Sequence, residues 1–209
     1  MQAWPGSALD VPSVIAALAR CAQDNGACAL RIQGEANITA VVDRVDVPVI
    51  GLIKRSYDGF EPYITPTTQE VSRVVNAGAS IVAFDATSRV RPRHERVSDI
   101  VAAIHNAGAV SMGDCAEFSD GVAACALGVH IIATTLASYT KTTAGLPLPA
   151  LDLVEQFKTL ECFVVCEGGV KTPLQVREAF RAGADSVVVG TAITNIDWLV
   201  QQFTAAVQE

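Results

Sequence analysis

Two ionisable side chains of this sequence, Lys54 and Glu167, stand where a proton could be moved on and off a substrate. Each directly follows a short apolar run, residues 50–53 before the lysine and residues 164–166 before the glutamate. If the first run is a strand, alternation places Lys54 on the same face as the buried residues of that run. Desolvation would lower the pKa of such a lysine toward a value that suits a general base or a Schiff base. The alternatives are a lysine that reaches into solvent and a glutamate that only pairs with a neighbouring cation.

Other apolar runs also end on polar residues, among them Arg31, Asp85, Asp114 and the pair Thr134-Thr135. Arg31 could stabilise negative charge on a carbonyl oxygen. Asp85 and Asp114 could accept hydrogen bonds from sugar hydroxyls or orient the lysine. No histidine joins the two aspartates, so we expect no metal site.

Two glycine turns suggest a phosphate site. Gly168-Gly169 comes shortly before Thr172-Pro173, which is typical of a helix start, and Gly190-Thr191 precedes the turn into the last helix. Backbone N–H groups at glycine turns and helix N-termini favour phosphate. We therefore expect Gly168, Gly169, Gly190 and Thr191 to bind phosphate.

The elements that would position these residues recur as a helix, a glycine and an apolar run. Such glycines suit the residue after a helix C-terminus, where a left-handed conformation is needed. They are Gly26, Gly78, Gly108, Gly128 and Gly183. The pattern predicts helices over residues 12–24, 36–44, 67–77, 94–107, 117–127, 150–159, 173–182 and 196–208. It predicts strands over residues 28–32, 47–53, 80–85, 109–113, 129–134, 162–167 and 186–190.

Continuous apolar strands that alternate with helices indicate a parallel sheet covered by helices. Eight helices and seven strands, with a helix first, favour one α/β domain over residues 1–209, a (β/α)8 TIM barrel. Its first strand would be truncated or very short, because Gln2 leaves almost no room before it. A doubly wound open sheet is the main rival. In either fold the polar strand ends lie at one edge, and barrels commonly bind phosphate after strands 7 and 8.

Composition excludes several classes of protein. The 209 residues are 50% hydrophobic and 18% charged, with a net charge of −7, so we expect a folded core and no binding to nucleic acid or an anionic membrane. No apolar run reaches the roughly 20 residues of a membrane helix, and the start lacks a signal-peptide pattern. Six cysteines without a C-x-x-C pair suggest free thiols in a reducing compartment.

Seven motifs together resemble the N-acetylmannosamine-6-phosphate 2-epimerase family. They are GLIKR at 51–55, ITPT at 64–67, FDAT at 84–87, GDC at 113–115, TTLASYT at 134–140, EGG at 167–169 and VGTAIT at 189–194. The resemblance covers nearly the whole chain. It implies a (β/α)8 barrel, a cytoplasmic homo-oligomer such as a dimer, and no cofactor.

The resemblance also implies a reaction and roles for residues. The substrate would be a phosphorylated N-acetyl amino sugar, with N-acetylmannosamine 6-phosphate and N-acetylglucosamine 6-phosphate interconverted in sialic acid catabolism. Lys54 and Glu167 match the catalytic residues, and Gln2, Arg31 and Asp114 match residues that contact the sugar. We also expect Asp85 and Tyr139, which lie in two of the motifs, to bind the substrate.

Two residues depart from the family pattern. The family usually has Arg or Asn where this chain has Gly169, and Arg where it has Asn195, so a bidentate phosphate ligand is lost. Lys171 is a candidate replacement. A Schiff-base aldolase or lyase, another phosphosugar barrel and a non-catalytic sugar-phosphate binding barrel therefore remain as alternatives.

In the last helix, Leu199 and Phe203 share a face that could pack on a second copy or on the barrel itself.

Overall fold

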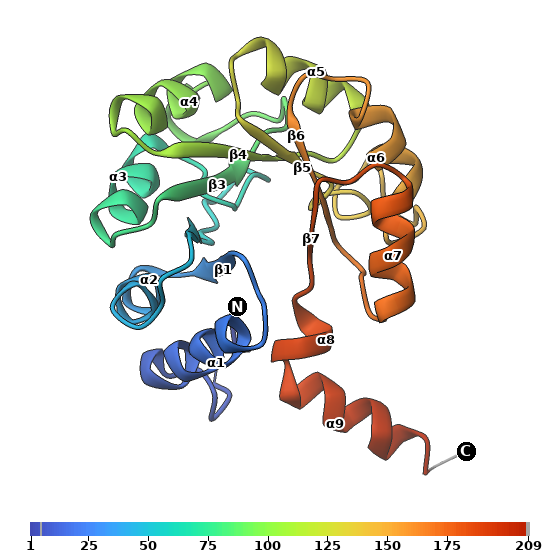
Figure 1. Cartoon of the computed structure of the whole chain (residues 1–209). Coiled ribbons are helices and arrows are strands. Elements are labelled where there is room, and N and C mark those ends of the chain that lie inside the picture. The colour runs from blue at the N-terminus through green and yellow to red at the C-terminus, as the bar shows by residue number, and fades with distance from the viewer. Residues whose placement is uncertain (5, 208–209) are drawn as a thin grey trace.

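The computed structural model describes residues 1–4 and 6–207, and in them seven parallel strands form one sheet in the order β1 to β7. The strands are β1 (Leu30–Gln33), β2 (Val49–Leu52), β3 (Ile81–Asp85), β4 (Val110–Asp114), β5 (Ile131–Ala133), β6 (Phe163–Glu167) and β7 (Ser186–Val188). Every strand predicted from the apolar runs is present. The sheet curls, as Figure 1 shows, so its strand ends gather around one opening.

Helices follow the strands and cover the outer face of the curled sheet (Figure 1). They are α1 (Pro12–Asp24), α2 (Glu35–Val42), α3 (Thr68–Asn76), α4 (Val97–Asn106), α5 (Phe118–Ala126), α6 (Leu151–Phe157), α7 (Pro173–Arg181), α8 (Thr191–Thr194) and α9 (Ile196–Ala205), with a 3-10 turn η1 over Pro92–His94. The fourth predicted helix starts later than expected, because Arg93 and His94 have positive φ angles of 59° and 55°. The last predicted helix ends earlier, at Ala205, and residue 208 of that prediction lies outside the described residues.

The core has two layers, as expected for a barrel. Thirty buried apolar residues, from Ile15 to Ala184, fill the space between the sheet and its helices. A smaller inner cluster fills the barrel and includes Ile50 and Leu52 of β2. Gly51 lies between them and faces outward, where an added Cβ would be 2.6 Å from the Cβ of Ala79. Glycine here lets the sheet approach its helix layer closely, and Ile50 and Leu52 point inward as the alternation predicts.

The segment before α1 is where the sequence predicts a clipped first strand. Residues 1–4 contain no strand, and the carbonyl of Met1 accepts a hydrogen bond of 3.2 Å from the backbone N–H of Gln33. This contact places the first residues beside β1. The short first strand remains a prediction, and the match to a TIM barrel rests on the other strands.

The prediction that all six cysteines are free is wrong for two of them. Cys125, in the last turn of α5, and Cys162, just before β6, form a disulfide with Cα atoms 6.4 Å apart. They are 37 residues apart in sequence, so spacing rules for short motifs could not pair them. Cys21, Cys28, Cys115 and Cys166 are free thiols.

No helix in the described part of the chain is long and apolar enough to cross a membrane. Within residues 1–4 and 6–207 there is likewise no cluster of three or more His, Cys, Asp or Glu side chains arranged to hold a metal ion.

Candidate active site

The ends of β1, β4 and β6 bring Arg31, Asp114 and Glu167 together. The Arg31 guanidinium donates to both carboxylate oxygens of Asp114, with Nη1–Oδ1 at 3.0 Å and Nη2–Oδ2 at 2.6 Å. Its Nε lies 3.1 Å from Oε1 of Glu167. The side chain of Asp114 is fully buried and that of Arg31 is 8% exposed. One arginine thus bridges two carboxylates that come from separate strands.

Burial alone would disfavour the charge on Arg31, but Asp114 and Glu167 outweigh this effect and raise the pKa of its guanidinium. Arg31 is therefore a fixed cation. It uses both carboxylates to stay charged inside the barrel, where an unpaired charge would be costly.

The surroundings of Glu167, unlike those of Arg31, disfavour the charged form of the side chain. Burial raises the pKa of its carboxyl group and Asp114 adds to the rise, while Arg31 and the hydroxyl of Thr135 act against it. Its Oε2 atom is buried and has no hydrogen-bond partner among the described residues. A carboxyl group with a raised pKa and an unused oxygen is suited to carry a proton.

Lys54 follows β2 and lies at the mouth of the barrel. Its side chain is exposed, and its Nζ atom lies 5.9 Å from the ring centroid of Tyr63. Partial desolvation by the surrounding mouth lowers the pKa of Lys54, and the positive charge of Arg31 lowers it further, against the opposing effects of Glu167 and Asp114. Burial thus lowers the pKa of the lysine and raises the pKa of the glutamate, so the two pKa values move toward each other.

Asp85 ends β3 and is fully buried, but its carboxylate is already engaged by its own loop. Oδ1 accepts hydrogen bonds from the backbone and the hydroxyl of Thr87, at 3.0 and 2.6 Å. Oδ2 accepts from Nη2 of Arg89 at 2.6 Å, and Arg91 donates to the backbone carbonyl of Asp85 at 2.5 Å. Its contact with substrate remains a prediction, since the structure shows it holding the loop after β3.

The other expected sugar contacts, Gln2 and Tyr139, have exposed side chains, and that of Tyr139 is 56% exposed. The structure adds Tyr63 and Arg89, which the sequence analysis missed. The pKa of Tyr63 is raised by burial and then by the negative charges of Asp114 and Asp85. Their positions next to motifs could have indicated both residues, since Tyr63 directly precedes the ITPT motif and Arg89 lies two residues after the FDAT motif.

The residues predicted to bind phosphate lie after β6 and β7. Gly168 and Gly169 have φ angles of +107° and +70°, so both use the left-handed region that favours glycine. Gly190 precedes α8 and Thr191 begins it, and both are exposed. The two glycine turns thus stand on neighbouring strands.

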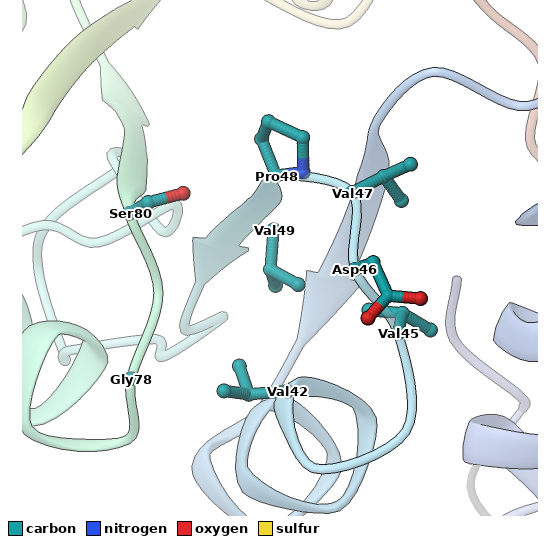
Figure 2. A pocket seen from close by; sticks show the side chains of 8 residues that line it. All are labelled: Val42, Val45, Asp46, Val47, Pro48, Val49, Gly78 and Ser80. Carbon is teal, nitrogen blue, oxygen red and sulfur yellow. The ribbon is translucent and has the colours of Figure 1, made fainter.

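A separate groove of about 300 Å³, shown in Figure 2, lies at the opposite end of the sheet. It opens where β2 and β3 begin, between Val42 and Ser80, and Asp46 is the ionisable residue among those that line it. None of the predicted site residues lines this groove.

Known proteins match this chain over nearly its whole length. Residues 15–209 match the family described as "Putative N-acetylmannosamine-6-phosphate epimerase". The chain belongs to this family. Proteins named "Putative N-acetylmannosamine-6-phosphate 2-epimerase" from Klebsiella pneumoniae (strain 342) and Edwardsiella ictaluri (strain 93-146) are 42% identical over 208 residues and 41% identical over 207 residues. In both cases the match covers 99% of this chain and 87% of the relative.

A solved structure agrees with this assignment. The N-acetylmannosamine-6-phosphate 2-epimerase from Clostridium perfringens matches with a TM-score of 0.94 and 36% sequence identity, covering 98% of this chain and 90% of the other. The epimerase family thus accounts for the curled parallel sheet as a TIM barrel.

Within the family, the departure at Gly169 has a steric explanation. A Cβ atom at this position would lie 2.3 Å from the Cβ of Leu148, far inside van der Waals contact. The loop that carries Leu148 occupies the space that a larger residue at position 169 would need. Glycine at position 169 therefore fits the close packing of this loop.

The departure at Asn195 has a local structural role. Its side-chain oxygen accepts a hydrogen bond of 2.9 Å from the backbone N–H of Trp198 and caps α9. Lys171 lies above the same tryptophan, with Nζ 5.9 Å from its ring centroid. A cation thus lies beside the first turn of α9.

Proposed function

We propose that this chain interconverts N-acetylmannosamine 6-phosphate and N-acetylglucosamine 6-phosphate by moving the proton on C2. The observation that carries the proposal is the contact of Arg31 with Glu167 at 3.1 Å, in a group of charges where the pKa of Glu167 is raised and that of Lys54 is lowered. Shifts in these directions increase the populations of neutral lysine and protonated glutamate, the forms that let the two exchange acid and base roles.

The proposed reaction starts from the open-chain aldehyde. One of the two groups removes the proton from C2, and the electron pair moves onto the carbonyl oxygen at C1 to give an enolate. Arg31 stabilises this oxygen, because Nη2 carries a second N–H besides the one that it gives to Asp114. The other group returns a proton to the opposite face of C2 as the electron pair moves back from the oxygen and restores the C1 carbonyl. The two groups end with their protonation states exchanged, and exchange of protons with solvent restores them.

The remaining residues bind the substrate in this proposal. Gln2, Asp85, Asp114 and Tyr139 contact the sugar together with Arg31. The backbone at Gly168, Gly169, Gly190 and Thr191 takes the phosphate, with Lys171 as the nearby cation. No cofactor or metal takes part in any step, because proton transfer next to a carbonyl needs only the acid, the base and the arginine.

A conversion assay tests the proposed activity. Addition of the chain to N-acetylmannosamine 6-phosphate should produce N-acetylglucosamine 6-phosphate, as followed by NMR. Unphosphorylated N-acetylmannosamine in a parallel reaction measures how far the phosphate is needed. Absence of product with bound substrate would favour the binding barrel. Trapping of substrate on Lys54 by borohydride would favour the Schiff-base lyase.

We further propose that the chain acts in the cytoplasm as a homodimer that uses α9. Figure 1 shows α9 extending away from the curled sheet. The exposed fractions of Ile196, Val200 and Phe203 on this helix are 44%, 53% and 77%. Apolar side chains at such exposure are typical of a surface that a partner covers. Light scattering should give the mass of two chains, and Phe203→Ser should shift it toward one; a wild-type monomer would contradict the proposal.

A further inference from the structure

We propose that Thr135 is a positioning residue whose hydroxyl holds Asp114, and through it Arg31, in the orientation that Glu167 requires. The inference rests on the proposed epimerase activity and assigns a role within the same site.

The order of the strands places Thr135 between Asp114 and Glu167. β5 lies between β4 and β6 in the sheet, and Thr134 and Thr135 directly follow its last residue. Asp114 is the last residue of β4 and Glu167 is the last residue of β6. The two threonines therefore stand between the two carboxylates.

Each threonine is bonded to a different neighbour. The hydroxyl of Thr134 accepts from the backbone N–H of Glu167 at 3.0 Å and donates to its carbonyl at 2.9 Å. The hydroxyl of Thr135 donates to Oδ1 of Asp114 at 2.7 Å. Thr134 thus fixes the backbone of the glutamate, while Thr135 fixes the carboxylate that orients Arg31.

The bond from Thr135 joins a continuous chain of contacts. The oxygen of Asp114 that it reaches also accepts from Nη1 of Arg31 at 3.0 Å, and Nε of Arg31 contacts Glu167 at 3.1 Å. Hydrogen bonds to a buried carboxylate are stronger than those between neutral groups. The Thr135 hydroxyl is also among the groups that lower the pKa of Glu167.

Three substitutions separate positioning from packing. Thr135→Val removes the hydroxyl and keeps the branched shape, whereas Thr135→Ser keeps the hydroxyl. Thr143→Val is the matched control, since Thr143 is buried in the same loop region and its hydroxyl pairs with that of Thr140 at 2.7 Å. Thr135→Ala replaces the valine variant if that variant does not fold, as judged by circular dichroism.

The measurements are kcat, KM and the pH profile of epimerisation. Thr135→Val should lower kcat about tenfold or more, with KM close to that of wild type. Its acid limb should move to higher pH, because the hydroxyl of Thr135, which acts to lower the pKa of Glu167, is gone. Thr135→Ser and Thr143→Val should keep wild-type rates and profiles.

Two results would overturn the inference. One is a Thr135→Val enzyme with wild-type kcat and pH profile, and the other is a serine variant as impaired as the valine variant. Failure of the wild-type chain to convert the substrate would instead refute the proposed function, so the two failures are distinguishable.

Discussion

The Nε atom of Arg31 lies 3.1 Å from Oε1 of Glu167, inside a barrel mouth that also contains Lys54. An arginine this close would by itself lower the pKa of the glutamate. Burial and the charge of Asp114 outweigh this effect of Arg31, so the pKa of Glu167 is raised overall. The protein thus places a fixed cation next to a carboxyl group whose pKa is raised.

Loss of either proton-carrying group should nearly abolish turnover. We expect Glu167→Gln and Lys54→Met each to lower kcat about 10²–10⁴-fold, the usual contribution of a positioned acid or base. Steady-state kinetics check this, with Lys158→Met as the control at an exposed lysine paired with Asp185. A wild-type rate in either site variant would contradict the assignment.

The pH profile of kcat/KM should be a bell narrower than the roughly pH 4 to 10 window of free Glu and Lys side chains. A carboxylate with a raised pKa is lost as pH falls through that value, and an ammonium with a lowered pKa is lost as pH rises through it. Both directions of the reaction should give the same bell, since the starting forms bind the same number of protons. A flat acid limb would argue against Glu167.

Asp114 should also matter for stability. Asp114→Asn removes the charge opposite buried Arg31, and breaking such a pair typically costs about 3–5 kcal/mol in the free energy of unfolding. The control is Asp24→Asn, whose ion pair with Arg20 is about half exposed, and it should cost less than about 1 kcal/mol. Urea denaturation measures both. Equal costs would mean that the buried pair is not an important contributor.

Gly169 should resist substitution for the steric reason given above. Gly169→Ala should destabilise the fold by about 1–3 kcal/mol through its contact with Leu148 and its positive φ. Gly59→Ala isolates the backbone effect, since Gly59 has φ +82° and open space around its Cβ position. Thermal unfolding compares the two variants. Similar losses of stability in the two variants would show that Leu148 can move to make room for the added methyl group without destabilising the fold.

Much of the fold follows from local rules. Each apolar run after a helix-ending glycine became a strand, and alternation placed Lys54 at the mouth because Ile50 and Leu52 pack inside the barrel. The Cys125–Cys162 pair could not be predicted, since it depends on how α5 and β6 meet. The use of Asp85 by Arg89 was also out of reach, because one loop folds back on its own strand end.

The central claim is that the proton on C2 leaves and returns by way of Lys54 and Glu167. It is tested most directly by incubating the chain with N-acetylmannosamine 6-phosphate in D₂O and following C2 by NMR. We predict N-acetylglucosamine 6-phosphate that carries deuterium at C2, and no exchange with Glu167→Gln. Product that retains hydrogen at C2 would contradict the account, because solvent would then have no access to the transferred proton.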